Sequence, residues 1–502
     1  MRGIVALLLL LVAVPAHPQE SGFDSALAAH VFGAALDFVA PRALDPVTVA
    51  TLAGWGLHGI TALDPALTAA VVDGQVQLTG PAGAIYARPI PSEGTGAAWG
   101  EALAAVANAA ASASAPVRQA GTQDVIQSVF DEMFNHLDPY SRYVAPVAAD
   151  EDRARRSGEA GAGLTLAREG RLTVIRSVNA NGSGAAAGLR AGDALLAVDG
   201  HPTRGQPVET VEDWVSGDEG TVVDLTVRDG RTGRVRRVAA ERAVTPPETV
   251  FASRVGDLLL LRVAFFAEDT DERIGTELAQ AVRGGHPVRG AILDLRDNRG
   301  GLLRQAVAAS ELMLGGGLVA TTAGRDPQAT HVWEGDSPDL LAGRPIVVLV
   351  DGRTASAAEI MAAALADRGR AVVTGSATYG KGLVQALTTL PDGGELFVSW
   401  SRLLAPLGWP LQGLGVMPQL CTSLGSSFVQ DQLDALAAGH DALAPALTRT
   451  RAARPPLPEA QAVEMRAACP AAVGRDADLD AARWLLAHQD GYRAALMPAA
   501  MQ

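Results

Sequence analysis

Residues 346–360 have the sequence IVVLVDGRTASAAEI, which gives the clearest indication of architecture in the chain. The apolar run 346–350 is typical of a strand buried on both faces. A turn follows at 351–354, and the alanine-rich segment 355–367 is predicted to be a helix. A buried strand that passes through a short turn into a helix is the repeating unit of an α/β protein with a largely parallel sheet.

The same alternation continues on both sides of this segment. It predicts strands at 258–263, 290–295 and 371–374 and helices at 269–282 and 302–314. Residues 248–425 are therefore predicted to form an α/β core. In such a sheet the ends of neighbouring strands lie beside each other, so the turns that follow them meet at one edge.

The remaining segments differ in character. Residues 22–150 have a mostly helical pattern, in which the alanine-rich helix 101–117 is expected to run into a linker. Residues 155–242 hold short strand candidates separated by glycine turns. Residues 428–502 return to helices. The chain is thus predicted to be a multidomain α/β protein with a helical N-terminal arm and a helical C-terminal tail.

Composition excludes several classes of function. The 502 residues carry 41 Lys and Arg against 55 Asp and Glu, a net charge of −14, which argues against a nucleic-acid-binding protein. Two cysteines cannot supply a zinc ribbon or an iron–sulfur cluster. The nine histidines are scattered and show no metal-binding spacing. We therefore predict no metal and no cofactor.

The first 16 residues indicate export. Arg2 precedes an apolar run of 11 residues at 4–14, which is shorter than the roughly 20 residues that span a bilayer. Small residues follow at a suitable cleavage position, so residues 1–16 are predicted to be a cleaved signal peptide. The expected location is periplasmic or extracellular, and an uncleaved membrane anchor is the alternative.

Cys421 and Cys469 are the two cysteines of the chain. An even number of cysteines in an exported protein favours a disulfide between them. Two separate buried thiols are the alternative.

Ser356 falls near the start of the predicted helix 355–367. Backbone N–H groups without helical partners and the positive end of the helix dipole lie there. A serine in this place can be an N-cap, which contributes roughly 1 kcal/mol to stability. It can also be a nucleophile whose oxyanion the same N–H groups stabilise.

Lys381 stands between two glycines, 25 residues after Ser356. That distance equals one strand–helix–strand crossover, so the lysine can return beside the serine. Burial would lower the pKa of its amine, and a neutral amine can accept the serine proton. Gln385, four residues on, could hold the amine in line. A solvated loop lysine is the alternative.

Residues 375–382, GSATYGKG, also resemble a phosphate-binding loop. Glycine stands where that loop needs serine or threonine for Mg²⁺, and a strand-like run follows in place of a helix. Both features argue against an NTPase.

Gly300 and Gly301 end the segment DLRDNRGG (294–301), which follows a predicted strand. Paired glycines there expose N–H groups that suit an anion. An ordinary strand–helix turn is the alternative.

Together these segments resemble the carboxyl-terminal processing (tail-specific) proteases, which are serine peptidases of the S41 family. The resemblance covers residues 120–425 and rests on the segments TASAAEI (354–360), YGKGLVQ (379–385), LDLRDNRGG (293–301), GVMP (415–418) and LDPYS (137–141). It implies a ClpP/crotonase-like protease core at 248–425.

Residues 155–242 resemble a PDZ domain, although on their own they would fit any small β domain. The segment GAGL looks like the loop that holds a terminal carboxylate, and it comprises Gly161, Ala162, Gly163 and Leu164. A bound peptide would add a strand beside 164–166 and lie against the predicted helix 208–215. The implied partners are protein or peptide substrates with free C-termini.

The family resemblance also assigns chemistry. It implies a Ser356/Lys381 dyad in which Gln385 orients the lysine, and an oxyanion site made by the N–H groups of Gly300 or Gly301 and of Ala357. No metal is needed for this mechanism. The sequence departs from the family pattern at three positions: Arg299 replaces a usual proline, Ala358 a usual serine and Gln419 a usual aspartate. These changes bear on loop rigidity and substrate preference more than on the dyad.

We therefore expect an exported serine endopeptidase that recognises protein C-termini through a PDZ domain. A noncatalytic peptide-binding scaffold with the same fold is the rival hypothesis. The helical ends are candidates for a homodimer contact or for an adaptor protein.

Overall fold

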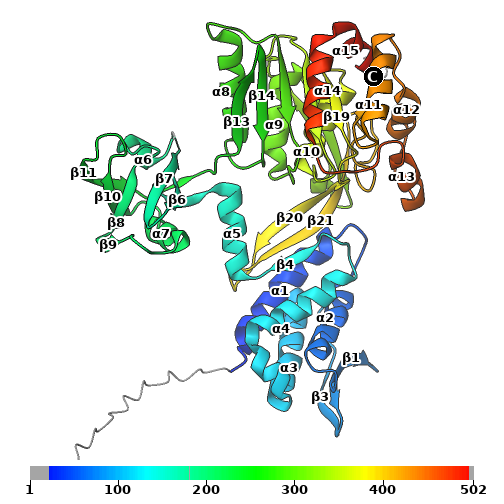
Figure 1. Ribbon diagram of the computed structural model, residues 1–502. Coiled ribbons are helices and arrows are strands. Elements are labelled where there is room, and N and C mark those ends of the chain that lie inside the picture. The colour runs from blue at the N-terminus through cyan, green and yellow to red at the C-terminus, as the bar shows by residue number, and fades with distance from the viewer. Residues whose placement is uncertain (1–21, 180, 497–502) are drawn as a thin grey trace, which may run out of the picture. The chain divides into compact units, whose positions relative to one another are not determined.

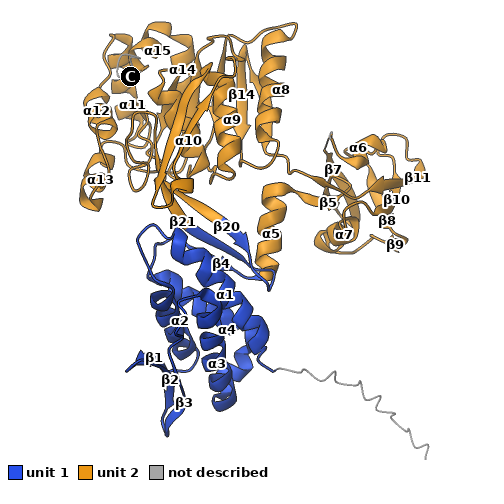
Figure 2. Ribbon diagram, turned by 180° about the vertical axis from the view of Figure 1, so that it is seen from behind, with its two compact units in different colours: residues 1–145, 387–398 blue, residues 146–386, 399–502 orange. Residues whose placement is uncertain are grey.

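The computed structural model describes residues 22–179 and 181–496. The chain divides into two compact units (Figure 2), of which unit 1 comprises Met1–Ala145 and Leu387–Val398 and unit 2 comprises Pro146–Ala386 and Ser399–Gln502. The predicted signal peptide, residues 1–16, lies outside the described residues. Within the described ranges, no helix combines the length and the apolar character needed to cross a membrane.

The described part of unit 1 combines helices with a small antiparallel sheet. Its helices are α1 (Ser25–Arg42), α2 (Val49–Leu63), α3 (Gly96–Ala113) and α4 (Ala115–Asn135). Its sheet has the order β1 (Thr68–Val72), β2 (Gln75–Gly80) and β3 (Gly83–Pro89). The apolar faces of these elements form one core, in which the rings of Phe32 and Phe130 pack edge to face. The predicted helical N-terminal region is confirmed.

The linker expected after the alanine-rich helix is not found, because α4 begins two residues after α3 ends. Ser114 makes this possible. Its N–H is donated to the Ala110 carbonyl at the end of α3, and its Oγ accepts the Val117 N–H at the start of α4. One serine therefore ends one helix and caps the next.

Unit 2 contains a small β domain built on an antiparallel sheet. Its strands have the order β11 (Val235–Glu241), β10 (Val222–Arg228), β8 (Ala194–Val198), β7 (Leu172–Val178) and β6 (Leu164–Glu169), and β9 (His201–Pro202) pairs with β8. Helices α6 (Ser183–Ala186) and α7 (Val208–Val215) complete it. Before it come α5 (Pro146–Ser157) and β5 (Glu159–Gly161), and β5 pairs with β12 (Ala243–Thr245). Strand β6 therefore lies at one edge of the sheet.

The second sheet of unit 2 is the α/β core. Its order is β13 (Val250–Val255), β14 (Leu258–Val263), β15 (Gly290–Asp294), β18 (Ile346–Val350), β19 (Ala371–Gly375) and β22 (Leu420–Cys421). Only the pair β13–β14 is antiparallel, and the four remaining pairings are parallel. The predicted α/β core with a largely parallel sheet is confirmed.

Helices cover both faces of this sheet (Figure 1). One face packs against α8 (Thr270–Arg283), α9 (Leu303–Leu314) and α10 (Ala357–Asp367), and the other against α11 (Ser426–Ala437), α14 (Asp476–Ala487) and α15 (Gln489–Ala495). In β18, Val348 and Val350 face the first layer, whereas Val347 and Leu349 face the second. Both faces of the strand are buried, which explains why it contains no polar residue.

A further sheet and two helices complete the fold. The sheet has the order β17 (His331–Gly335), β16 (Gly317–Gly324), β21 (Glu395–Leu404) and β20 (Leu383–Thr389), and β4 (Arg142–Val144) pairs with β21. The short 3₁₀ helix η1 (Pro327–Ala329) lies between β16 and β17. Helices α12 (Ala444–Arg451) and α13 (Glu459–Arg466) contribute Leu447 and Met465 to apolar clusters of unit 2. The predicted C-terminal helices are thus part of the packed core unit.

Candidate active site

Ser356 lies in the turn between β18 and α10 and has an unusual backbone. Its φ is 56° and its ψ is −119°, a combination that costs a non-glycine residue on the order of 1–3 kcal/mol and persists only when the surroundings enforce it. The turn before it is held by Asp351, whose Oδ1 accepts the N–H groups of Asp297, Arg353 and Thr354 at 3.0 Å each. The side chain of Ser356 is partly exposed.

Glu359 lies one turn into α10 and is completely buried. Its carboxylate accepts four hydrogen bonds: Oε2 takes the N–H groups of Ser356 (2.8 Å) and Lys381 (2.9 Å), and Oε1 takes the Gly380 N–H (2.7 Å) and the Thr378 hydroxyl. The nucleophile turn and the lysine loop are therefore tied to one side chain. Burial raises the pKa of this carboxyl, and the four hydrogen bonds act in the opposite direction.

Lys381 follows β19 in a loop that packs closely on another stretch of backbone. A side chain at Gly382 would place its Cβ 2.1 Å from the Gln412 nitrogen, and Gly380 has a φ of 89°. Both positions therefore require glycine. The Lys381 amine donates to Gln385 Oε1 at 3.4 Å, and both side chains are half-buried.

Gly300 and Gly301 lie in the loop after β15, against the Ser356 turn. A Cβ at Gly300 would come within 2.8 Å of the Ser356 Cβ. The Gly300 N–H is donated to Asn298 Oδ1 at 2.8 Å, and the buried Asn298 donates in turn to the Val263 carbonyl. Ala357 is the first residue of α10, where a helix leaves backbone N–H groups without helical acceptors. The loop is thus fixed against Ser356, and the Gly300 N–H is already donated to Asn298.

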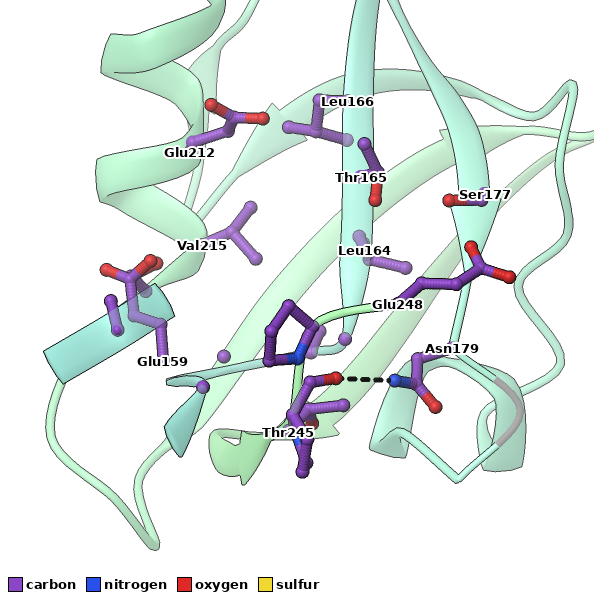
Figure 3. A pocket seen from close by; sticks show the side chains of 18 of the residues that line it. Glu159, Leu164, Thr165, Leu166, Ser177, Asn179, Glu212, Val215, Thr245 and Glu248 are labelled. Carbon is purple, nitrogen blue, oxygen red and sulfur yellow. Dashed lines mark hydrogen bonds between the residues drawn. The ribbon is translucent and has the colours of Figure 1, made fainter. Parts of the chain in front are cut away.

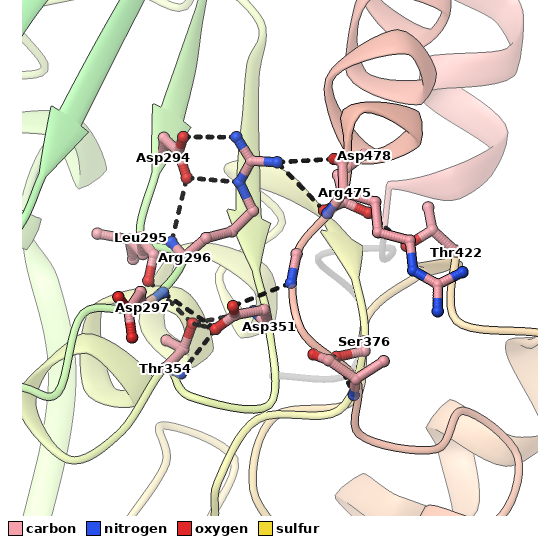
Figure 4. A network of polar contacts seen from close by, with 12 residues as sticks. Asp294, Leu295, Arg296, Asp297, Asp351, Thr354, Ser376, Thr422, Arg475 and Asp478 are labelled. Carbon is pink, nitrogen blue, oxygen red and sulfur yellow. Dashed lines mark hydrogen bonds and ion pairs between the residues drawn. The ribbon is translucent and has the colours of Figure 1, made fainter.

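A polar network joins the same turns to the C-terminal part of the chain (Figure 4). Arg296 donates to Asp294 at the end of β15 and to Asp478 of α14. Asp351 Oδ2 accepts the Gly474 N–H at 3.1 Å. These bonds hold the segment before α14 against the Ser356 turn.

Cys421 and Cys469 are joined in a disulfide. Cys469 lies a few residues before Ala472, whose carbonyl accepts the Gly352 N–H at 2.7 Å. The disulfide therefore anchors the segment that leads to the active-site turn. In the two ranges that the structure covers, no group of three or more His, Cys, Asp or Glu side chains is arranged to hold a metal ion.

The second candidate site is a cavity of about 370 Å³ in the small β domain (Figure 3). It is lined by β6, α7 and the segment of Gly161, Ala162, Gly163 and Leu164, which joins the end of β5 to the start of β6. Gly163 has a φ of 68°, which suits glycine, and the structure shows no acceptor for the N–H groups of Ala162 and Gly163 among the residues it describes. The four predicted residues thus lie immediately before and at the start of β6, which is an edge strand.

Sequence reasoning missed the residues that organise these turns, namely Asp351, Asn298 and above all Glu359. For Glu359 a local signal was present, because Ser356-x-x-Glu359 matches a capping box at a helix start. Its second role, as acceptor for the lysine loop, depends on a contact 22 residues away and has no local signal.

Comparisons with known proteins found similarity to one peptidase family and to PDZ domains. Residues 257–421 match the model of "Peptidase family S41", and residues 174–229 match that of "PDZ domain". The carboxy-terminal-processing protease of Bartonella bacilliformis is 31% identical over 301 residues, covering 59% of this chain and 69% of that protein. The carboxyl-terminal-processing protease of a Picosynechococcus species is 34% identical over 307 residues, covering 59% and 73%.

Among solved structures, a photosystem II D1 C-terminal processing protease is 26% identical, with a TM-score of 0.36. The match covers 61% of this chain and 86% of that one.

Proposed function

The chain belongs to peptidase family S41, the family of the carboxyl-terminal-processing proteases, and carries a PDZ domain. From this premise we propose that it is an exported serine endopeptidase that uses a Ser356/Lys381 dyad on proteins recognised by their C-termini. The observation that carries the proposal is the carboxylate of Glu359, which accepts the backbone N–H groups of both dyad residues.

In the proposed reaction Ser356 Oγ attacks the carbonyl carbon of the scissile peptide bond. The Lys381 amine accepts the hydroxyl proton as the new C–O bond forms, and Gln385 holds that amine in line. Lys381 then gives the proton to the leaving amine as the C–N bond breaks. Water then attacks the carbonyl carbon of the acyl-enzyme and gives a proton to the Lys381 amine. Lys381 returns this proton to Ser356 Oγ as the ester bond breaks.

The developing oxyanion needs N–H donors close to Ser356. We assign this role to Ala357 and Gly301, because the Gly300 N–H is donated to Asn298. Gly300 instead lets the loop approach, since any side chain there would press on Ser356.

The PDZ domain is proposed to bind the C-terminus of the substrate. Ala162 and Gly163 would donate their N–H groups to the terminal carboxylate, and the peptide would pair with the open edge of β6. This assignment follows from the sheet order, which leaves β6 at the edge.

Export is proposed from residues 1–16, which have the pattern of a signal peptide. The Cys421–Cys469 disulfide supports it, because disulfides persist in oxidising compartments.

The test compares cleavage of an unfolded reporter protein by the wild type and by Ser356→Ala. The variant is expected to lose cleavage and to keep its unfolding midpoint, and Lys381→Met is expected to behave alike. Wild-type activity should rise with pH as the lysine amine loses its proton. A folded wild type that cleaves nothing would favour the noncatalytic scaffold.

A further inference from the structure

Arg466 is the last residue of α13, and its side chain reaches the loop that carries Lys381. The guanidinium donates to the Thr378 carbonyl at 2.7 Å and to the Leu414 carbonyl at 2.6 Å, and the side chain is half-buried. Thr378 lies three positions before Lys381, and Leu414 belongs to the stretch of backbone on which the lysine loop packs. One side chain of the C-terminal helices therefore fastens the lysine loop to its support.

Thr378 also connects this contact to Glu359. The Thr378 hydroxyl accepts the Val416 N–H at 2.7 Å and donates its own hydrogen to Glu359 Oε1. The other three partners of the Glu359 carboxylate are backbone N–H groups, which can only donate. Four donors fit the ionised carboxylate, so Glu359 carries a negative charge in this arrangement.

The negative charge of Glu359 is buried among neutral donors. A buried carboxylate is costly unless a positive charge lies close to it. Lys381 acts as a neutral amine in the proposed reaction and does not supply that charge. Arg466 does, because the two charges attract: burial lowers the pKa of the Arg466 guanidinium, and the charge of Glu359 raises it.

The neighbours of Arg466 in the chain hold it in this place. Met465 is buried in the same apolar cluster as Leu414, and Cys469, three positions after Arg466, is joined to Cys421 by the disulfide. Arg466 lies outside residues 257–421, the part of the chain that matches the family model. The C-terminal helices thus bring a cation to the catalytic loops from beyond the matched region.

We propose that Arg466 is a positioning residue of the active site, whose charge compensates the buried Glu359 carboxylate and whose two hydrogen bonds fix the lysine loop. Without Arg466 the carboxylate holds the N–H groups of Ser356 and Lys381 less firmly, so the hydroxyl and the amine are aligned less often. This inference rests on the proposed Ser356/Lys381 reaction and adds the C-terminal helices to the parts that it requires.

The test measures steady-state cleavage of a peptide by the full chain and its variants. Arg466→Met is expected to lower kcat about ten-fold with KM nearly unchanged, because the side chain touches no substrate. Arg466→Lys keeps a positive charge and should stay within about three-fold of the wild type. In a Glu359→Gln background, which has no charge to compensate, Arg466→Met should change kcat by less than about two-fold.

Arg344→Met is the matched control. Arg344 is also half-buried and donates to two backbone carbonyls, those of Val288 and Leu341. It precedes β18, whereas Ser356 follows that strand, so the two lie at opposite ends of it. Arg344→Met should keep the wild-type kcat even where its unfolding midpoint in urea falls.

Hydrogen exchange gives a second measurement that does not depend on activity. Gly380 and Lys381 donate their amides to Glu359, so the peptide that contains them should exchange faster in Arg466→Met and at the wild-type rate in Arg344→Met.

The inference would be overturned by an unchanged kcat or unchanged exchange in Arg466→Met. It would also be overturned by an equal loss of kcat in Arg344→Met, or by an undiminished effect of Arg466→Met in the Glu359→Gln background. A wild type that cleaves nothing would contradict the proposed function alone, and the exchange rates would then decide whether Arg466 positions the lysine loop.

Discussion

Ser356 and Lys381, which are 25 positions apart in the sequence, donate their backbone N–H groups to the same oxygen atom, Oε2 of Glu359, at 2.8 and 2.9 Å. Oε1 of the same carboxylate holds Gly380 and Thr378. One buried side chain thus sets the position of the nucleophile turn relative to the lysine loop. Glu359 touches neither substrate nor the reacting atoms in the proposed reaction, so it is a positioning residue.

Glu359→Gln is expected to reduce kcat at least ten-fold while leaving KM nearly unchanged, because an amide cannot accept all four donors. Stability should fall by about 1–3 kcal/mol, the cost of leaving buried donors unpaired. Glu311→Gln is the matched control, since Glu311 is a half-buried carboxylate of α9 that accepts only the Ser337 hydroxyl in the contacts described. Steady-state kinetics decide the matter: an unchanged kcat in Glu359→Gln would refute the positioning role.

Arg451→Met should destabilise the core by about 3–5 kcal/mol, because it leaves the buried Asp367 carboxylate without its cation. The two groups lie 2.7 Å apart, and both are almost completely buried. Arg449→Met, on the same helix, removes an exposed pair with Glu464 and should cost about 0–1 kcal/mol. Urea unfolding of both variants measures the difference, and equal losses would contradict the prediction.

The effect of Arg451→Met on stability should also depend on pH. Burial raises the pKa of Asp367, and the charge of Arg451 opposes this. Without Arg451 that pKa should rise further, so the folded state binds a proton more readily than the unfolded chain. Stability is then lost as pH rises above the usual carboxyl value near 4. The loss of unfolding free energy caused by Arg451→Met should therefore be smaller at pH 4 than at pH 7. A loss that does not change with pH would contradict this prediction.

Asn298→Ala should loosen the loop after β15 that carries Gly301, one of the two proposed oxyanion donors. It removes the acceptor of the Gly300 N–H and the donor to the Val263 carbonyl, at a cost of about 1–3 kcal/mol. Arg299→Ala, one position on, removes an exposed ion pair with Asp297 and should change stability by about 0–1 kcal/mol. Peptide hydrolysis should fall in the first variant only. Full activity in Asn298→Ala would show that the loop needs no such support.

Replacing Cys421 and Cys469 by serine should lower the free energy of unfolding by about 4 kcal/mol, from the entropy of closing a loop of 48 residues in the unfolded chain. Urea titrations of the wild type with and without reductant should reproduce the difference. Coincident midpoints would mean that the disulfide adds nothing to stability.

Much of the core could be predicted because its signals are local. The strands at 258–263 and 346–350 and the helix at 208–215 were predicted with the bounds that the structure shows. The apolar run 346–350, for example, is bounded by Pro345 and Asp351, so neighbouring segments do not blur it.

Other features depend on contacts between distant segments. Strand β11 (Val235–Glu241) was not predicted, since its exposed positions mix apolar and charged residues (Val235, Arg237, Ala239 and Glu241) and it forms only by pairing with β10. The segment that carries Gly474 shows no sequence signal for its place beside Asp351. The spacing Ser356-x-x-Glu359 carries a local capping signal, but nothing in the sequence indicates Glu359 as the acceptor for the Lys381 N–H. Tertiary hydrogen bonds of this kind leave no periodic trace in a single sequence.

The nucleophilic role of Ser356 is tested most directly by mapping the acyl-enzyme. The protein is mixed with an activated peptide ester, quenched in acid within the first turnover, digested and analysed by mass spectrometry. The acyl group is expected on the peptide that contains Ser356 and nowhere in the Ser356→Ala variant. An acyl group on another residue, or equal labelling of the variant, would contradict the proposed mechanism.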